Sequence, residues 1–225
     1  MKETIKKIPI IGPFVRRVYR VLKPIKPFLN SESYWEDRYK SGGSSGAGSF
    51  GKLAKYKAEI INDFVCKNTI QSIIERGCGD GNQLKLAKYK FYIGFDVSSA
   101  AISLCKKSFR EDNSKVFKTN EEYKDDMAEL ALSLDVIFHL VEDDIYQLYM
   151  KRLFTSSKKY VIIYSSNIDI EPSQHERHRI FTTYVEKNFP DWKLLQHIPN
   201  KYPFSGNIKK GSMSDFYIYK KSFKN

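Results

Sequence analysis

A predicted strand that runs directly into three alternating glycines is the feature that most constrains the fold of this chain. The strand is expected at Ser72–Glu75, and Gly77, Gly79 and Gly81 follow it before a helix expected at Asn82–Lys88. Because glycine has no Cβ, such a turn lets a ligand lie against the backbone at the carboxyl end of the strand. The helix would then present free N–H groups and its positive dipole end to the same ligand.

An acidic residue follows the next predicted strand, Tyr92–Phe95. Asp96 lies nineteen residues after Gly77, and an acid at this spacing can accept hydrogen bonds from both hydroxyls of a ribose. The glycine turn, the helix and this acid together predict a site for a nucleoside-type cofactor. A dinucleotide site needs a G-x-G-x-x-G pattern to bring a pyrophosphate close to the helix. Here Asn82 follows the third glycine, so the spacing favours a different nucleoside.

Beyond residue 70, short apolar runs alternate with helical segments, and this alternation predicts a mostly parallel, doubly wound α/β sheet. The remaining strands are expected at Lys115–Phe117, Leu130–Leu134, Tyr160–Tyr164, Lys193–His197 and Phe216–Lys220. The remaining helices there are expected at Ala100–Phe109, Asp143–Phe154 and Arg179–Asn188. Two earlier helices, Ser33–Tyr39 and Phe50–Cys66, flank a Gly/Ser-rich run over residues 41–49. That run is either an inert loop or a lid over a site.

Residues 1–30 are predicted to form a basic amphipathic extension, followed by one domain over residues 31–225. Within that domain, residues 31–69 form a helical lead-in that carries the Gly/Ser lid. From Phe14 onward, apolar side chains recur at positions 14, 15, 18, 19 and 22, on one face of a helix. A basic helix of this kind, within residues 1–28, either lies on an anionic membrane surface or docks on its own domain.

The formal net charge of +12 has two interpretations. It reflects a lysine-rich surface, or it attracts an anionic partner such as nucleic acid, phospholipid headgroups or a phosphorylated substrate. No run reaches the ~18 consecutive apolar residues of a membrane-spanning helix. Cys66, Cys78 and Cys105 have neither metal-ligand nor disulfide spacing. We therefore expect no metal site and a cytoplasmic protein. If the protein associates with a membrane, we expect peripheral contact at the inner face of the cell membrane.

The E-x-G-C-G-x-G pattern at Glu75–Gly81 closely resembles motif I of class I S-adenosylmethionine-dependent methyltransferases. Phe95–Ser98 is similar to their second motif, and Leu132–Leu140 is similar to the fourth-strand segment, in which a hydrophobic stretch ends in His-Leu. The resemblance covers roughly residues 70 to 165. It implies a Rossmann-like, doubly wound sheet of seven mostly parallel strands with the last strand antiparallel, helices on both faces and a helical N-terminal extension.

Four further segments are similar to a bacterial subgroup of these enzymes that is often associated with capsule or other surface-polysaccharide synthesis. The segments are Tyr34–Tyr39, Gly42–Ser49, Arg177–Arg179 and Pro199–Pro203. This resemblance implies that the methyl acceptor is a small molecule or is glycan-linked.

The class resemblance also implies which residues bind the cofactor. Glu75 would reach the amino group of S-adenosylmethionine directly or through water, and Asp96 would hold its ribose. The methionine part would lie against the glycine turn, and the implied set is completed by Gly77, Cys78, Gly79, Gly81 and Ser133. An acid after the third strand would meet the adenine, and the candidates there are Glu121, Glu122, Asp125 and Asp126.

Arg76 departs from the family pattern, which has an apolar side chain at this position. A buried arginine without a partner is costly. We expect Arg76 to pair with a nearby acid or to extend its charged end to solvent. The third alternative is that the position has been altered. The departure bears on cofactor affinity and not on the fold.

Methyl transfer requires chiefly that the acceptor be aligned with an already activated methyl group. A base that removes the proton of an acceptor hydroxyl adds ~10²–10⁴-fold. His139, at the end of the fourth strand, is one candidate base, and its alternative role is structural, as a cap of the following helix. Asp135 either faces the methyl-transfer zone or is a satisfied acid at the strand end. His175 and His178, after the fifth strand, are the preferred bases for a hydroxyl acceptor.

Acceptor binding is expected in the long connection over residues 165–179, because loops at the carboxyl ends of strands often build substrate pockets. Arg177 and Arg179 would bind a phosphate or carboxylate there, which predicts an anionic acceptor. The alternative is that both arginines only begin a solvated helix. Tyr34, in the lead-in, and Tyr202, before the last strand, are further candidates for acceptor contacts.

The combined hypothesis is an O-methyltransferase that uses S-adenosylmethionine, releases S-adenosylhomocysteine and acts on a small or glycan-linked, phosphorylated acceptor. An RNA or protein methyltransferase is one alternative, because the positive charge can steer a polyanion. Against nucleic acid, the chain has no recognisable RNA-binding module and no Asn-Pro-Pro-Tyr-type segment after the fourth strand. A binding protein that retains the cofactor without turnover is the other alternative, and Arg76 is its support.

Overall fold

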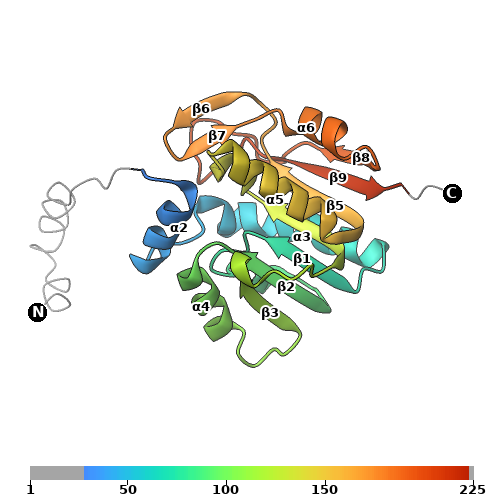
Figure 1. Ribbon diagram of the computed structural model, residues 1–225, viewed down its shortest axis with the longest axis horizontal. Coiled ribbons are helices and arrows are strands. Elements are labelled where there is room, and N and C mark those ends of the chain that lie inside the picture. The colour runs from blue at the N-terminus through green and yellow to red at the C-terminus, as the bar shows by residue number, and fades with distance from the viewer. Residues whose placement is uncertain (1–27, 223–225) are drawn as a thin grey trace, which may run out of the picture.

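Seven strands form one sheet at the centre of the computed structural model, which describes residues 28–222 (Figure 1). They are β1 (Ser72–Arg76), β2 (Phe91–Asp96), β3 (Lys115–Thr119), β4 (Ala128–Leu134), β5 (Ser157–Ser165), β8 (Trp192–Ile198) and β9 (Asp215–Lys221). Their order across the sheet is β3-β2-β1-β4-β5-β9-β8. The strands β1 to β5 pair in parallel, and β9 runs antiparallel between β5 and β8. The predicted seven-stranded, mostly parallel sheet with its last strand antiparallel is confirmed.

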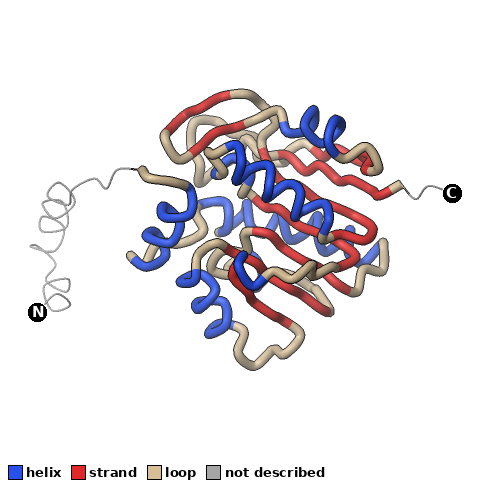
Figure 2. The backbone as a smooth tube through the Cα atoms, in the orientation of Figure 1, coloured by secondary structure: helices blue, strands red, loops and turns tan. Residues whose placement is uncertain are grey.

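Helices cover both faces of this sheet (Figure 2). The α-helices are α2 (Ser31–Lys40), α3 (Gly51–Lys67), α4 (Ser99–Ser108), α5 (Asp143–Thr155) and α6 (Phe181–Asn188). Single 3₁₀ turns are η2 (Ala47–Ser49), η3 (Gln83–Leu86), η4 (Asn120–Glu122) and η5 (Ile137–His139). Helices α3 and α4 contribute to the apolar core on one face, and α5 and α6 to the core on the other. The expected strands and all but one of the helices expected within residues 28–222 are present, with ends that differ by at most three residues.

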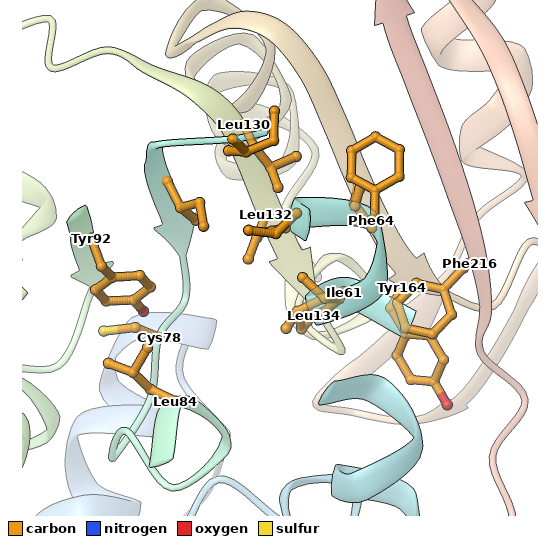
Figure 3. Close-up of a cluster of buried hydrophobic side chains, with 14 of the residues drawn as sticks. Ile61, Phe64, Cys78, Leu84, Tyr92, Leu130, Leu132, Leu134, Tyr164 and Phe216 are labelled. Carbon is orange, nitrogen blue, oxygen red and sulfur yellow. The ribbon is translucent and has the colours of Figure 1, made fainter. Parts of the chain in front are cut away.

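Each face of the sheet has its own apolar core because the parallel strands are buried on both sides. Adjacent residues of β1 show this: Ile73 belongs to the cluster with α3 and α4, and Ile74 to the cluster with α5 and α6. Figure 3 shows the first cluster, in which Cys78 and Leu84 lie near Tyr92 of β2. Cys78, within the glycine turn (Gly77–Gly81), and Leu84, just after it, therefore anchor the turn in the core at the carboxyl end of β1.

The α-helix expected at Asn82–Lys88 is wrong, because the chain forms only the 3₁₀ turn η3 and is already extended at Ala87. Asn62 of α3 accounts for the early end. Its side-chain amide donates to the Leu86 carbonyl oxygen at 2.9 Å and accepts from the Lys88 amide at 2.9 Å. These backbone groups are satisfied by a side chain instead of by a further helical turn. The dipole of a long helix is accordingly not available to a ligand at this position.

The connection that follows β5 is also more ordered than expected. Where an open loop was predicted over residues 165–179, the chain forms a two-stranded hairpin of β6 (Ile170–Ser173) and β7 (Glu176–His178). Strand β7 packs against η5, the turn after β4. The hairpin therefore lies beside the carboxyl end of β4, the edge at which parallel sheets bind ligands.

The basic amphipathic helix expected from Phe14 lies outside the described residues, as do all but the last of residues 1–28, for which membrane contact and docking on the domain were the two alternatives. The domain boundary predicted near residue 30 stays a prediction, and the first described helix, α2, begins at Ser31. Asn30 caps that helix, and its side chain accepts a hydrogen bond from the Ser33 amide at 2.8 Å. Within residues 28–222, no helix has both the length and the apolar character needed to cross a bilayer.

Candidate functional site

A pocket lies at the carboxyl ends of β1, β2 and β4. Most of its lining comes from the glycine turn with the adjoining strand ends, from the lead-in with its Gly/Ser loop, and from the turn after β4, while the end of β3 and helix α5 add one residue each. The residues predicted for the cofactor that line it are Glu75, Gly77, Cys78, Gly79 and Asp96. Asp135 and His139, predicted for the acceptor side, line the same pocket.

All three glycines of the turn adopt backbone conformations that other residues avoid. The φ angle is +78° at Gly77, +58° at Gly79 and +72° at Gly81, in the left-handed region where a Cβ is penalised. Space is restricted as well. A Cβ at Gly77 would lie 2.5 Å from a Val136 methyl carbon, and one at Gly79 would lie 2.2 Å from the Ser45 hydroxyl oxygen. Gly81 faces α4 and is not part of the pocket lining.

Asp96 joins the end of β2 to the glycine turn. Its buried carboxylate accepts hydrogen bonds from the Gly79 amide at 2.9 Å and from the Ser98 amide at 2.9 Å. Burial is the largest influence on this group and raises the pKa of Asp96 to about 6. Each carboxylate oxygen can accept more than one hydrogen bond, so Asp96 can also accept from the hydroxyls of a ribose.

Glu75 is the second buried acid of the pocket. The Tyr92 hydroxyl donates to its Oε2 at 2.7 Å. Burial raises the pKa of Glu75 to about 7, while the Tyr92 hydrogen bond and the Lys57 ammonium act in the opposite direction. A cationic ligand group near this carboxyl would favour its ionised form further. The environment of Glu75 therefore suits the amino group that the sequence resemblance placed here.

Lys57 of α3 is a pocket residue that the sequence analysis missed. It is about 1% exposed, and its Nζ donates to Oδ2 of Asp135 at 2.7 Å. The signal was present in the sequence, because Lys57 lies four residues after Leu53 and four before Ile61. A lysine at that spacing falls inside the apolar stripe of the helix, where an ammonium group needs a partner.

Asp135 faces the pocket in a strained conformation. Its φ is +57°, a region in which non-glycine residues are uncommon and often functional. Its Oδ1 accepts from the Ser214 hydroxyl at 2.9 Å, while Lys57 occupies Oδ2. The lead-in also approaches it closely, since a Cβ at Gly48 would lie 2.7 Å from Oδ2. Contacts from α3, from the Gly/Ser loop and from the β8–β9 loop thus hold one carboxylate at the pocket.

Ser133 and Cys78, two residues of the predicted cofactor set, differ in their access to the pocket. Ser133 is fully buried outside the pocket lining, and its hydroxyl accepts from the Tyr149 hydroxyl at 2.7 Å. Tyr149 lines the pocket in its place. A hydrogen bond with Cys105, together with burial, raises the pKa of the Cys78 thiol, so this cysteine is a protonated wall residue.

The three candidate histidines have different surroundings. His139 lines the pocket, its ring lies edge-on to Trp35 with centroids 4.9 Å apart, and burial lowers its pKa to about 4. His175 lies behind it, with its ring stacked on Tyr34 at 4.6 Å. His178 is buried, stacked on Phe138 at 5.0 Å, and its Nδ1 is hydrogen-bonded to the Ser166 hydroxyl.

His139 is therefore the histidine that the structure brings to the pocket, whereas His175 and His178 were preferred from the sequence. Burial lowers the pKa of His178 as well, and neither His175 nor His178 belongs to the pocket lining. Within residues 28–222, no group of three or more His, Cys, Asp or Glu side chains is arranged to hold a metal ion.

Arg177 and Arg179 hold the start of α5 and do not line the pocket. Both pair with Asp143 at 2.9 Å. Arg179 also donates to the carbonyl oxygens of Leu140 at 2.7 Å and Val141 at 2.8 Å. These contacts give the arginines a structural role, and the acceptor phosphate predicted for them stays a prediction.

Tyr34 and Tyr202 also lie outside the pocket lining. Tyr34 stacks on His175 as described above, and Tyr202 packs edge-on against Tyr56 with centroids 5.9 Å apart. The lead-in instead contributes Trp35 and Tyr39, which both line the pocket. Acceptor contacts of the two predicted tyrosines stay predictions.

The Gly/Ser loop rests across the glycine turn. The Ser45 hydroxyl donates to Oδ1 of Asp80 at 2.8 Å and accepts from the Asp80 amide at 3.1 Å. The Asn82 side-chain amide donates to the Ser49 carbonyl oxygen at 2.5 Å. The loop is thus fixed over the turn by defined hydrogen bonds, as a lid would be.

Asn120 is the polar residue that the end of β3 brings to the pocket. Of the four acids proposed to meet an adenine, none lines this pocket, and Glu121 lines a neighbouring one together with Asn120. Glu122 caps η4 by accepting from the Thr119 amide at 2.7 Å, and Asp126 pairs with Lys118 at 2.6 Å.

Arg76 points away from the pocket into the core beneath α5. It is about 1% exposed, and its Nη2 donates to the Ser156 hydroxyl at 3.1 Å. Its guanidinium carbon lies 4.7 Å from the Phe95 ring centroid and 4.1 Å from that of Tyr123. Within residues 28–222 it neither pairs with an acid nor reaches solvent, so these two of the three alternatives are wrong. Two aromatic faces take the place of a carboxylate.

The sequence matches no protein-family model and no curated protein. The fold, in contrast, matches solved structures of methyltransferases. Magnesium protoporphyrin IX methyltransferase (ChlM) from Synechocystis PCC 6803 with bound SAM aligns at a TM-score of 0.62 and 12% identity, over 86% of this chain and 98% of that one.

Two further structures extend this comparison. The N-methyltransferase NodS from Bradyrhizobium japonicum WM9 in complex with S-adenosyl-L-homocysteine aligns at a TM-score of 0.68 and 10% identity, over 86% of this chain and 99% of that one. A S-adenosylmethionine-dependent methyltransferase from Clostridium acetobutylicum ATCC 824 aligns at 0.56 and 13% identity, over 94% and 99%. This chain therefore has the fold of S-adenosylmethionine-dependent methyltransferases.

Proposed function

We propose that this chain is an S-adenosylmethionine-dependent methyltransferase whose cofactor binds in the pocket at the carboxyl ends of β1, β2 and β4. The observation that carries the proposal is the convergence of Glu75, the glycine turn and Asp96 on this one pocket. Support also comes from the fold, which is shared with methyltransferases crystallised with this cofactor or its product.

The residues present suit the groups of this cofactor. Glu75 offers a carboxyl to the amino group, and Asp96 offers acceptor oxygens to the ribose hydroxyls. Gly77 and Gly79 let the Val136 and Ser45 side chains pack against the turn, where a Cβ would clash, and both glycines line the pocket. Asn120 and Val97 line the pocket beyond Asp96 and would face the base. When bound, the cofactor supplies a methyl group activated on a sulfonium, and the acceptor takes it in line.

His139 and Asp135 would manage the acceptor proton. His139 is neutral near pH 7, because burial lowers its pKa to about 4. Its Nδ1 lies 3.3 Å from the His175 carbonyl oxygen, and since a carbonyl only accepts, the proton belongs on Nδ1. The other ring nitrogen, Nε2, is then free to accept the proton of an acceptor hydroxyl. Asp135, which lines the same pocket, would orient the acceptor.

The acceptor that we propose is a small or glycan-linked hydroxyl compound, as in capsule or surface-polysaccharide synthesis. Its support is the similarity of the lead-in and of residues 177–179 and 199–203 to that subgroup. Among the described residues that line the pocket, Lys57 is the one lysine or arginine, and Asp135 already neutralises it. A phosphorylated acceptor would therefore hold its charge outside the pocket, toward Arg177 and Arg179, and would compete there with Asp143.

Calorimetric titration of the full chain with S-adenosylmethionine, S-adenosylhomocysteine and NAD tests the cofactor. We expect micromolar binding of the two sulfur nucleosides and none of NAD. Asp96→Asn is expected to weaken binding about tenfold, because an amide nitrogen cannot accept from the ribose hydroxyls or the turn amides. Equal binding of NAD, or no binding of either sulfur nucleoside, would contradict the proposal.

Release of S-adenosylhomocysteine with a panel of glycans and sugar phosphates then tests the acceptor. Turnover with a hydroxyl compound that is lost in His139→Ala supports the proposed base. Turnover with RNA instead would favour the alternative in which the net charge of +12 steers a polyanion. Binding of the cofactor without turnover on any acceptor would favour the non-catalytic alternative.

A further inference from the structure

The β8–β9 loop, residues 199–214, is fixed at its neck and turns its tip outward. At the neck, the Ser212 amide donates to the Tyr202 carbonyl oxygen at 2.9 Å, and Pro203 pairs with Ser212 in an isolated β-bridge. Gly211 packs so closely that a Cβ would lie 2.2 Å from the Pro203 carbonyl oxygen. Near the tip, the Asn207 carbonyl oxygen accepts from the Lys210 amide at 2.9 Å. The loop therefore projects from the domain with a defined shape.

The tip exposes large apolar side chains that the domain does not use. Every residue from Pro203 to Lys210 is exposed. Phe204 is 42% exposed and Ile208 is 67% exposed. Burial of such side chains is a main source of stability in a folded chain, and this loop holds both of them in water. Apolar side chains gathered on one projecting loop, rather than scattered singly, are candidates for an interaction surface.

The charge around these apolar side chains has one sign. Lys201, Lys209 and Lys210 belong to the loop, and residues 198–214 contain no aspartate or glutamate. Lys52 of α3 adds a fourth cation, with its Nζ 4.3 Å from the Tyr202 ring centroid. The next acid along the chain, Asp215, is engaged by His197 at 2.8 Å. The surface is thus both apolar and cationic.

We propose that the β8–β9 loop docks on an anionic lipid bilayer. Phe204 and Ile208 enter the boundary between headgroups and acyl chains, and the lysines contact the anionic headgroups. A nucleic acid fits less well, because single strands are held by stacking of bases on rings, and the most exposed apolar residue of the tip, Ile208, has none. The loop ends at Ser214, which donates to Asp135 of the pocket, so docking places the pocket beside the bilayer.

Co-sedimentation of the full chain with phosphatidylcholine vesicles, with and without phosphatidylglycerol, tests this surface. We expect binding that requires phosphatidylglycerol. Phe204→Ser with Ile208→Ser should lower the partition coefficient about tenfold, because the inserted apolar area is lost. Lys209→Glu with Lys210→Glu should lower it at least about tenfold, because attraction becomes repulsion. The N-terminal residues are present in all variants, so their contribution is common to every comparison.

Matched variants elsewhere on the surface serve as controls. Leu194→Ser with Leu195→Ser removes an exposed apolar pair from β8. Lys106→Glu with Lys107→Glu on α4 changes the net charge as much as the loop variant does. Both controls should bind within about twofold of the parent chain. Loop and control variants that lose binding equally, or loop variants that lose none, would overturn the proposal, as would a parent chain that does not bind.

Fluorescence locates the contact independently of affinity. In Ile208→Trp, the additional tryptophan emission should shift to shorter wavelength with phosphatidylglycerol vesicles and stay unchanged with phosphatidylcholine alone. The control Leu195→Trp on β8 should not shift. An unshifted emission in Ile208→Trp while the protein still sediments with vesicles would show that another surface makes the contact, and would overturn the proposal for this loop. None of these outcomes depends on methyl transfer.

Discussion

Lys57 and Arg76 are buried cations on opposite faces of the sheet, and the fold accommodates them in opposite ways. Each is about 1% exposed. Lys57 pairs with Asp135 at 2.7 Å and lines the pocket. Arg76 is held by one serine hydroxyl and two aromatic faces, and its Nε and Nη1 have no hydrogen-bond partner within residues 28–222.

The difference teaches that burial alone does not mark a functional charge. Burial lowers the pKa of Arg76, so the core works against its charge, and the pocket gains nothing from it. The charge of Lys57 is balanced by the carboxylate of Asp135, whose backbone is strained. The Lys57 ammonium in turn favours the ionised form of the Glu75 carboxyl and so lowers its pKa. The two cations differ in their counter-ion. Lys57 pairs with Asp135, which the site itself holds in place, whereas Arg76 has a serine hydroxyl and two rings instead of a carboxylate.

The largest effect is expected when Lys57 loses its charge. Lys57→Met keeps the length of the side chain but leaves Asp135 without its counter-ion. Breaking a buried pair in this way costs about 3–5 kcal/mol, and the partial exposure of Asp135 places the expected loss in the free energy of unfolding at the lower end. Urea denaturation measures it, and calorimetry should show weaker binding of S-adenosylhomocysteine.

The double variant Lys57→Met with Asp135→Asn is the control for that result. Removing both charges should recover part of the loss, because no uncompensated carboxylate remains. If the losses in the free energy of unfolding of the two single variants simply add, the two side chains are not coupled. Asp135 would then not be the feature that distinguishes Lys57 from Arg76.

The pH dependence of stability gives the next largest effect. The pKa of Glu75 is about 7 in the folded chain against an ordinary value of 4.5, so the folded state binds this proton more tightly than the unfolded state does. The resulting stabilisation is fully present below pH 4.5 and is lost as the pH rises through 7. We expect the free energy of unfolding to fall across that window by on the order of 2–3 kcal/mol from this group.

Variants of the two cations sharpen this pH test. Lys57→Met removes a charge that favours the ionised carboxyl, so the decline should extend to higher pH, whereas Arg76→Met should leave it unchanged. Glu75→Gln should remove this part of the slope. Denaturation curves collected from pH 4 to pH 9 decide the matter, and an identical decline in Glu75→Gln would assign it to other groups such as Asp96.

Arg76→Met should stabilise the protein by about 1–2 kcal/mol, because an apolar side chain of similar length replaces a buried charge without a carboxylate. Thermal denaturation measures the gain, and Arg76→Lys, which keeps a charge and loses the ring contacts, should be less stable than the parent. Affinity for S-adenosylhomocysteine should stay unchanged, because Arg76 does not line the pocket. A loss of stability in Arg76→Met would mean that the Phe95 and Tyr123 rings compensate the charge fully.

The smallest effect is expected at the hydroxyl that shares Asp135 with Lys57. Ser214→Ala removes the hydrogen bond to Oδ1 of Asp135 and should cost about 1 kcal/mol. Ser103→Ala, which removes an exposed hydroxyl on α4, is the matched control and should be neutral. Equal effects of the two changes would indicate that Lys57 alone positions the carboxylate.

Much of the fold was predictable because its signals are local. The alternation of apolar runs and helices indicated the strands of the sheet, and the spacing of Gly77 and Asp96 located the pocket. The failed helix at Asn82–Lys88 had a distant cause, since the chain is intercepted there by Asn62, a residue of another element. The β6–β7 hairpin was missed because its strands are only four and three residues long, with the sequences IEPS and ERH, which leaves no apolar alternation to detect.

The motif residues of the site were predictable along β1, β2 and β4, and the Gly/Ser loop was a candidate lid. Trp35 and Tyr149 reach the pocket through tertiary packing that no motif encodes, whereas Lys57 gave only the signal of a lysine in the apolar stripe of α3. The position of a residue after a strand was also a misleading guide to anion binding. Arg177 and Arg179 were expected to bind an anion because they lie after β5, yet Asp143 and two carbonyl oxygens of a neighbouring turn had already engaged them.

The contact of Ser45 with the glycine turn has a kinetic consequence. Its hydroxyl lies 2.2 Å from where a Cβ of Gly79 would be and is hydrogen-bonded to Asp80. A nucleoside bound as we propose, beneath the Gly/Ser loop, would depart after that contact has opened. Occupancy at equilibrium depends on the walls of the pocket, whereas residence time depends on how often the loop lifts. Loosening the loop would therefore speed the exchange of spent cofactor for fresh, even where the walls of the pocket are untouched.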